Sequence, residues 1–461
     1  MDVHTTHQRT LPVAGRPTEA TLTVRADDSA PGRCSSLSVV ASSTTSPRPI
    51  VFVFNGGPGV SSMWLQLSGL APWRAGVPQD LDQPFDALPA LQFTETSLFD
   101  VADLVFLDPP GTGFSSHPAP PEALGAESDA ALFAETIVTW LREHGREASD
   151  VFVLGESYGT IRAALVASRL DDQWPGVRLR GIALLGQCLN AQEVTQRPGN
   201  AAGFVAALPF IAATAWFHGL GDHTDRSLVE TTNAARFFAA GPYSQALAAG
   251  AWTEEVDEAL RGFSGLSLPT LRRLRRRIDK EWFRRSLLAD LASHVGLTDS
   301  RYSLRGDPGQ DIDAADARLT PVFAAALGEL HSSVFGVPQG HTYTESFEAH
   351  ESWDYQESSA EFSFGGSPLP SPFASFDYPR HLQNFLDRAA GRRVFIGTGH
   401  FDALTTVGGV DHLLTQYGLP TERFDRHEYP AGHMMYSDAP SSLTLVSDLK
   451  RFLTTCTTPF P

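Results

Sequence analysis

Two hydrophobic patterns divide the chain. From Arg9 to Ser43 apolar and polar residues alternate, which is typical of antiparallel strands with one face exposed. Later segments are short and continuously apolar, as expected for strands covered on both faces in a mostly parallel sheet. These segments are Ile50–Phe54, Leu104–Leu107, Val151–Leu154, Ile182–Leu185 and Val394–Ile396. Helical patterns such as Asp129–Arg142 lie between them, so the sequence predicts an α/β domain with antiparallel strands at one edge.

The alternation of strands and helices stops in the middle third of the chain. Helical patterns dominate there, at Ser227–Phe238, Thr253–Arg261, Pro269–Ser293 and Leu319–Leu330. We therefore expect residues 1–190 to form the first part of the core, 191–375 a mainly helical cap insertion, and 376–461 the second part of the core. A cap above the carboxyl edge of the sheet would enclose a ligand site.

A serine stands at the junction of a predicted strand and a predicted helix. The pentapeptide Gly155-Glu156-Ser157-Tyr158-Gly159 follows Val151–Leu154 and precedes the helical pattern Thr160–Ala167. A sharp strand-to-helix turn strains the serine backbone and leaves no room for side chains on either flank, hence the two glycines. A chance match is conceivable in a chain with 39 glycines. The flanking strand and helix favour a nucleophile elbow, and therefore an enzyme.

A serine nucleophile needs a histidine to take its proton and a carboxylate to fix the imidazole tautomer. In hydrolases with this elbow, the acid and then the histidine follow the serine along the chain. Asp402 comes directly after the strand that ends at Ile396, and His433 follows the strand-like segment Phe424–Tyr429. Both therefore reach the same sheet edge as Ser157. His400 is the main alternative to His433.

The oxyanion of an acyl-transfer reaction needs two backbone N–H donors. Tyr158 supplies the first, because it follows the nucleophile. A glycine-rich loop, Asn55–Ser62, follows the strand that ends at Phe54 and is the candidate for the second. A phosphate-binding loop is the competing interpretation, but the Lys-Ser/Thr ending and the dinucleotide-binding spacing are missing.

Four motifs together resemble the serine carboxypeptidases, a family with the α/β-hydrolase fold. They are Asn55–Gly59 with Ser61-Ser62, Asp108–Ser115, Gly155–Gly159 and Gly432-His433-Met434. The chain looks closest to the bacterial branch of the family. That further similarity lies in Pro198–Asn200, Ala212–Gly219, Asp299-Ser300-Arg301 and Ala431–Tyr436. The resemblance covers roughly residues 50–455 and implies an α/β-hydrolase core with a large helical cap.

The resemblance implies roles for individual residues. Ser157, Asp402 and His433 are expected to form a catalytic triad. The backbone N–H groups of Gly57 and Tyr158 are expected to form the oxyanion hole. Asn55 and Glu156 are expected to bind the free α-carboxylate of a peptide. A carboxylate can receive another carboxylate only if the two share a proton. Glu156 is therefore expected to have a raised pKa, and activity is expected to favour mildly acidic pH.

The chain also departs from the family pattern. Val60 stands where secreted relatives have a cysteine, and Leu67–Pro72 lacks the second substrate-facing glutamate of many eukaryotic members. The acid loop reads Asp402-Ala403-Leu404-Thr405-Thr406 rather than Asp-Leu-Ala-Thr-Pro.

Three functions consequently stay open. The first is a serine carboxypeptidase, the second an acyltransferase or esterase in small-molecule or peptide maturation, and the third a non-catalytic binding protein with the same fold.

Charge and cysteine content narrow the expected surroundings. The formal net charge of −18 disfavours nucleic acid and anionic membranes as partners. Three cysteines, Cys34, Cys188 and Cys456, are too few for a disulfide framework and favour a reducing compartment. The first residues lack a basic start followed by an apolar stretch, so we expect a cytoplasmic protein. It is expected to act on a peptide or small acyl substrate without metal or cofactor, as a monomer or homodimer.

Overall fold

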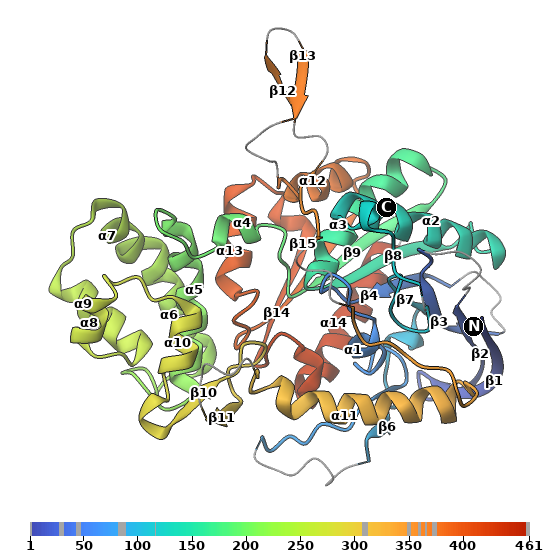
Figure 1. The fold of residues 1–461 in the computed structure, drawn as a ribbon, viewed down its shortest axis with the longest axis horizontal. Helices are drawn as coiled ribbons and strands as arrows, with labels where there is room; N and C mark the ends of the chain where they lie inside the picture. Colours follow the sequence, from blue (N-terminus) through green and yellow to red (C-terminus); the bar gives the residue numbers. More distant parts are fainter. Residues whose placement is uncertain are drawn as a thin grey trace.

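A computed structural model describes residues 2–26, 32–42, 48–81, 89–115, 117–306, 312–347, 352–357, 361–364, 367–370 and 376–457 (Figure 1). Its centre is a nine-stranded sheet. In spatial order the strands are β1 (Val3–Val13), β2 (Arg16–Ala26), β3 (Ser35–Ala41), β7 (Asp103–Asp108), β4 (Ile50–Phe54), β8 (Asp150–Glu156), β9 (Arg178–Leu185), β14 (Arg393–Gly399) and β15 (Phe424–Tyr429). The first three strands are antiparallel, β3 pairs antiparallel with β7, and β7 through β15 run parallel. The strand predictions are confirmed.

Helices cover both faces of the sheet, and each face has its own apolar cluster. One face is covered by α2 (Ala126–Glu143), α3 (Tyr158–Gln173), α12 (Pro379–Asp387) and α13 (Val407–Gln416). The other is covered by α1 (Met63–Gln66), α11 (Asp316–Glu329) and α14 (Ala439–Thr457). Every residue of β4 and β7 is buried, as the continuous apolar runs predict. The protein has the α/β-hydrolase fold.

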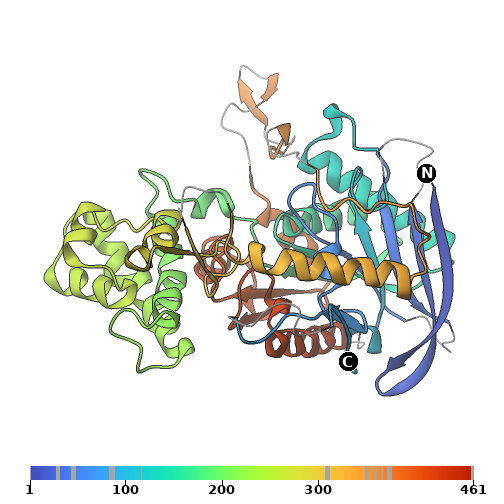
Figure 2. The ribbon, with the colours of Figure 1, turned by 60° about the horizontal axis from the view of Figure 1, so that its bottom comes forward.

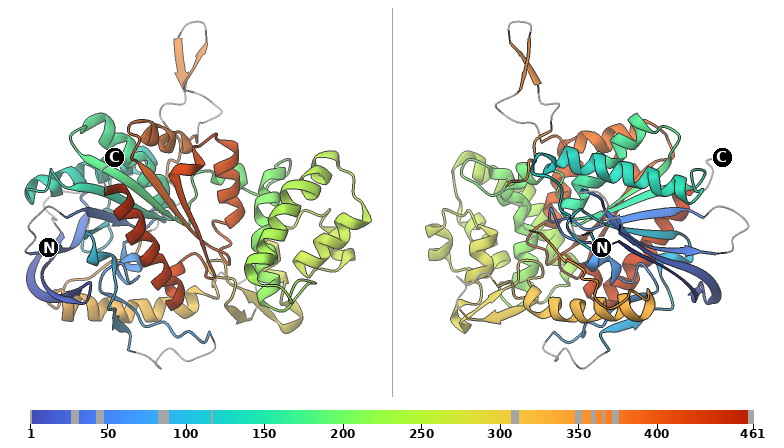
Figure 3. Two further views of the ribbon diagram at one scale, coloured as in Figure 1. Left: turned by 180° about the vertical axis from the view of Figure 1, so that it is seen from behind. Right: turned by 45° about the vertical axis from the view of Figure 1, so that its right-hand side comes forward.

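A group of helices stands beside the sheet and is called the helical lobe here (Figures 2 and 3). It consists of α5 (Ala201–Phe217), α6 (Leu228–Phe238), α7 (Ser244–Ala249), α8 (Glu254–Ser264), α9 (Leu268–Arg273) and α10 (Lys280–Ser286). The lobe packs around an apolar cluster of its own, to which Phe210, Leu260 and Phe283 contribute fully buried side chains. It joins the core through α5, which packs against α13.

The helical pattern over Pro269–Ser293 is confirmed only in part, because it does not form one continuous helix. The chain forms α9 and α10 instead, with Arg275 and Arg276 between them in the left-handed region at φ 52° and 57°. Contacts distant in sequence hold this turn, because the Arg276 guanidinium binds Asp257 (2.9 Å) and Tyr243 donates to Arg276 O (2.7 Å). Tertiary contacts override the local helical pattern here.

The inserted middle third contains more than the lobe. Helix α11 packs on the core instead, where the Phe323 ring lies 4.6 Å from that of Trp64. The expected cap boundaries of 191 and 375 stay a prediction, and residue 375 lies outside the described residues. Among the described residues, the remaining α-helix and β-strands are short: α4 (Ala191–Val194), β5 (Trp73–Ala75), β6 (Leu91–Phe93), β10 (Ser293–Val295), β11 (Ser303–Arg305), β12 (Glu361–Phe364) and β13 (Ser367–Pro370). The β12–β13 hairpin projects away from the body (Figure 1).

Within the described ranges, no helix combines the length and apolar character needed to cross a bilayer. All three cysteines are free thiols. The cytoplasmic location stays a prediction.

Candidate active site

Ser157 occupies a sharp turn between the end of β8 and the start of α3. Its backbone lies at φ 59° and ψ −128°, a strained conformation for a residue other than glycine. A Cβ added to Gly155 would lie 1.9 Å from Gly159 O, and one added to Gly159 would lie 2.9 Å from Phe54 O. Both glycines are thus required by close backbone approach, which is the geometry of a nucleophile elbow.

Asp402 and His433 meet at the carboxyl edge of the sheet. His433 Nδ1 lies 2.7 Å from Asp402 Oδ2, and both side chains are buried. The other oxygen of Asp402 accepts hydrogen bonds from Leu404 N (2.8 Å) and Thr405 N (3.0 Å). With Nδ1–H directed at Asp402, Nε2 of the neutral imidazole is left as the proton acceptor.

Burial disfavours a charged His433, but the carboxylates of Asp402, Glu156 and Asp316 together outweigh burial and raise the pKa of His433 to about 9. This shift favours the imidazolium, so His433 must first lose a proton before its Nε2 can accept one from a nucleophile. The Thr405 hydroxyl donates to Asp402 Oδ2 (2.5 Å) and lies 3.3 Å from His433 Nδ1. The sequence pattern alone does not mark this threonine as a partner of the Asp402–His433 pair.

The turn after β9 lies between Ser157 and His433. Leu185 O accepts a hydrogen bond from Ser157 N (2.9 Å), and a Cβ on Gly186 would lie 2.8 Å from His433 Cε1. Among the described residues no hydrogen bond joins the Ser157 hydroxyl to His433. Such contacts often tighten only when substrate binds. The structure therefore brings the three predicted residues to one place without closing the triad, whose catalytic role stays a prediction.

The glycine-rich loop after β4 packs directly on the elbow. A Cβ on Gly56 would lie 2.5 Å from Tyr158 N, so no larger residue fits there. Gly57, Ser157 and Tyr158 line the same cavity of about 240 Å³. This placement suits the predicted oxyanion hole, in which backbone N–H groups converge on a site beside the nucleophile.

The side chains of Asn55 and Glu156 are in contact, and Tyr436 from the loop that carries His433 binds Glu156 as well. Asn55 Nδ2 donates to Glu156 Oε2, and the Tyr436 hydroxyl donates to the same oxygen (2.8 Å). Glu156 Oε1 is buried and has no hydrogen-bond partner among the described residues. Burial raises the pKa of Glu156 to about 7, as the sequence analysis expected in direction. Tyr436 was missed, although it belongs to the same motif as His433.

Arg162, on α3, is a second residue that the sequence analysis missed. Its guanidinium is fully buried, forms a bidentate pair with Asp129 (2.7 and 3.1 Å) and donates to Asn55 O (2.6 Å). It therefore ties the nucleophile helix to α2 and to the glycine-rich loop. The signal in the sequence was an arginine on the buried face of a helix, which needs a charged partner.

His400, the alternative to His433, lies beside Glu428 and Thr232. Its Nε2 is 3.7 Å from Glu428 Oε2, and its Nδ1 is 3.5 Å from the Thr232 hydroxyl. Its burial lowers its pKa, in contrast to the raised pKa of His433. The contact with Asp402 belongs to His433.

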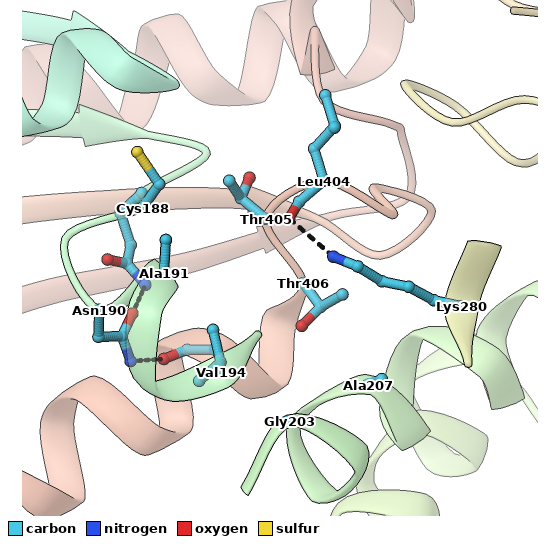
Figure 4. Close-up of a pocket in the computed structure, with 12 residues that line it drawn as sticks. Cys188, Asn190, Ala191, Val194, Gly203, Ala207, Lys280, Leu404, Thr405 and Thr406 are labelled. Carbon is cyan, nitrogen blue, oxygen red and sulfur yellow. Dashed lines mark hydrogen bonds between the residues drawn. The ribbon is translucent and has the colours of Figure 1, made fainter. Parts of the chain in front are cut away.

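One cavity adjoins the elbow. It includes Ser157 and has a largely apolar wall, formed in part by Ile161, Tyr355 and Tyr378. Cys188 lines both this cavity and a smaller one of about 30 Å³ beside the acid loop, which Figure 4 shows. In that cavity Lys280 of the helical lobe donates to Leu404 O (3.0 Å), and burial lowers the pKa of Lys280.

A comparison with protein families finds a match to part of the chain. The sequence model described as serine carboxypeptidase matches residues 38–248, which include the glycine-rich loop and the elbow. Residues 38–248 are thus similar to the serine carboxypeptidases. Together with the α/β-hydrolase fold and the elbow, this match supports a serine hydrolase. The placement in the bacterial branch stays a prediction, and no curated protein matches the chain.

Solved structures of low sequence identity resemble the chain. Proline iminopeptidase from Mycobacterium smegmatis is 15% identical with 98% of each chain covered and a TM-score of 0.37. A soluble variant of monoglyceride lipase from Saccharomyces cerevisiae is 12% identical with 95% of each chain covered and a TM-score of 0.40. Epoxide hydrolase A from Mycobacterium thermoresistibile is 13% identical with 98% of each chain covered and a TM-score of 0.35. Similarity at this level carries no argument about substrate.

We expect Arg162→Met to destabilise the protein severely, because it leaves the buried Asp129 carboxylate without its charged partner. The expected loss in the free energy of unfolding is about 3–5 kcal/mol, measured by urea denaturation. Arg169→Met on the same helix is the matched control. Arg169 pairs with Glu127 at partly exposed positions, so a loss below about 1 kcal/mol is expected. Equal losses in the two variants would contradict the role given to Arg162.

Proposed function

We propose that this chain is a serine carboxypeptidase that releases C-terminal residues from peptides through an acyl-enzyme. The observation that supports this most directly is the position of Glu156. A buried carboxyl group with one unpaired oxygen stands one residue before the elbow serine and is bound by Asn55. A general hydrolase has no need of a second buried acid at this point, whereas a carboxypeptidase must recognise a free α-carboxylate.

The proposed reaction uses the elbow, the acid–base pair and the glycine-rich loop. Ser157 Oγ attacks the carbonyl carbon of the last peptide bond while His433 Nε2 takes the hydroxyl proton and Asp402 holds Nδ1–H. The N–H groups of Gly57 and Tyr158 stabilise the oxyanion. His433 then gives its proton to the leaving amine, and the C–N bond breaks. In the second half of the reaction, water attacks the acyl-enzyme ester while His433 takes a proton from the water and returns it to Ser157 Oγ as the ester bond breaks.

The proposed carboxylate site works by sharing one proton. Because burial raises the pKa of Glu156 to about 7, the side chain carries a proton in mildly acidic solution. Protonated Glu156 can donate to the anionic α-carboxylate of a peptide, and the Asn55 side chain provides a second polar contact. The Tyr436 hydroxyl stays protonated because burial and the nearby Glu156 raise its pKa well above its ordinary value.

The cavity beside Ser157 supports a preference for a large apolar residue on the acyl side. Its volume is about 240 Å³, and Ile161, Tyr355, Phe376 and Tyr378 are among the residues that line it. Apolar and aromatic side chains gain the most binding free energy when they move from water into a cavity lined in this way.

The proposal is tested by incubating the protein with a peptide library and identifying products by mass spectrometry. Each peptide is supplied with a free, an amidated and an esterified C-terminus. We expect loss of single residues from free C-termini, fastest where the penultimate residue is large and apolar. Cleavage or acyl transfer confined to esters would instead support the acyltransferase or esterase.

Substituting Glu156 tests the carboxylate site separately. For the parent, we expect the ratio of kcat/KM for a free C-terminus to that for its amide to fall as pH rises through about 7, by about tenfold per pH unit above it, because the proton that is shared with the substrate is lost. The protonation of His433 affects both substrates alike and cancels in the ratio. In Glu156→Gln the ratio should be small and independent of pH.

Glu127→Gln is the control for this measurement. Glu127 pairs with Arg169 at a partly exposed position on α2, so the variant should keep the parent's ratio and its pH dependence. If Glu156→Gln discriminates between the two C-termini as well as the parent does, the assignment of Glu156 is wrong.

A further inference from the structure

A short segment of the inserted region, residues 297–301, passes between the two loops that carry Asp402 and His433. It follows β10, which lies between the helical lobe and α11 (Figure 1). Its main chain forms three hydrogen bonds with those loops: His433 N to Thr298 O (2.6 Å), Ala403 N to Leu297 O (3.1 Å) and Ser300 N to Phe401 O (3.0 Å). One bond is thus made to the proposed base itself, and two flank the proposed acid.

Two charged side chains of the segment extend this contact. Asp299 Oδ2 accepts a hydrogen bond from Gly432 N (3.1 Å), one residue before His433. Arg301 binds both oxygens of Asp299 (Nη2–Oδ2 2.7 Å, Nε–Oδ1 3.0 Å) and donates to Pro430 O (2.9 Å). Asp299 and Arg301 therefore hold the two ends of the turn that leads to the histidine.

The fit at Gly432 is close. A Cβ there would lie 2.3 Å from Asp299 Cβ and 2.4 Å from Thr298 O, so only glycine allows the segment to approach the histidine loop. The side chains of Asp299 and Arg301 are 2% and 8% exposed. A buried ion pair contributes little net stability because both groups lose hydration, whereas it does fix one arrangement of the groups around it.

The segment is also fixed on its other side by the helical lobe. The Thr214 hydroxyl of α5 lies 2.6 Å from the Ser300 hydroxyl, and His218 Nε2 lies 2.8 Å from Ser300 O. The lobe, the segment and the two catalytic loops consequently form one hydrogen-bonded unit. The position of His433 depends on a part of the chain that lies outside the sheet core.

We propose that Asp299 and Arg301 are positioning residues, which act through Gly432 and Thr298 to hold the His433 imidazole in line with Ser157. This inference rests on the proposed role of His433 as the base. A small displacement of a catalytic group is enough to slow a reaction strongly while substrate binding is unaffected. The loss expected on removing the pair is therefore one of rate.

The test compares kcat and KM for a nitrophenyl ester of an N-acylated apolar amino acid. We expect Asp299→Ala to lower kcat by about 100-fold with KM unchanged. Asp299→Asn should recover part of the loss, because an amide oxygen can still accept from Gly432 N. The pH at which kcat is half-maximal should shift in Asp299→Ala, since the imidazole changes its surroundings.

Asp171→Ala is the matched control. Asp171 forms a similarly buried bidentate pair with Arg392, at 10% and 11% exposure, on the far end of α3 from the elbow. It should lose thermal stability to a similar degree while kcat stays at the parent value. If Asp299→Ala does not fold, Arg301→Lys takes its place, because lysine keeps the charge but loses the bidentate geometry; a reduced kcat at unchanged KM is again expected.

The outcomes separate the two proposals. A parent protein without ester hydrolysis, or one whose activity survives His433→Ala, overturns the proposed base and the positioning role together. An active parent with an Asp299 or Arg301 variant of equal kcat overturns the positioning role alone. A loss of kcat in the Asp171 control as large as in Asp299→Ala also overturns it, because the effect would then be one of general stability.

Discussion

The site depends on the contact of two backbone turns, the elbow at Ser157 and the glycine-rich loop after β4. The turns approach so closely that a Cβ at Gly56 would lie 2.5 Å from Tyr158 N. Arg162 holds them together, because its buried guanidinium binds Asn55 O from the nucleophile helix. This contact places two groups of backbone N–H donors beside the serine and sets Asn55 against Glu156. The proposed oxyanion hole and the proposed carboxylate site thus depend on a single constraint.

The proposed acid and base are held by a different part of the chain. Asp402 and His433 lie on loops after β14 and β15, and segment 297–301 bonds to both loops. The nucleophile side is held by core helices, whereas the base side is held through the helical lobe. The two sides differ in their electrostatics. Burial raises the pKa of Glu156, whereas the carboxylates around His433, led by Asp402, together outweigh burial and raise the pKa of the histidine.

Features with a local signal could be predicted from the sequence. The continuous apolar run at Ile50–Phe54 and the alternation before Ser43 identified strands, and the glycines around Ser157 identified the elbow. The meeting of Asp402 and His433 could be predicted because each follows a strand in the expected order, while their catalytic roles stay a prediction. The contacts of Arg162 with Asp129 and of Asp299 with Gly432 could not be predicted, since the partners are far away in the sequence. The break in the helical pattern over Pro269–Ser293 could not be predicted for the same reason, because Asp257 and Tyr243 fix the turn at Arg276.

The central claim is that Ser157 is a nucleophile activated by the Asp402–His433 pair. The most direct measurement is reaction with a fluorophosphonate, which captures an activated serine covalently, followed by peptide mass spectrometry to locate the adduct. We expect a single adduct on Ser157 in the parent protein and a strongly slowed reaction in His433→Ala. A folded parent that does not react, or an adduct on another residue, would contradict it.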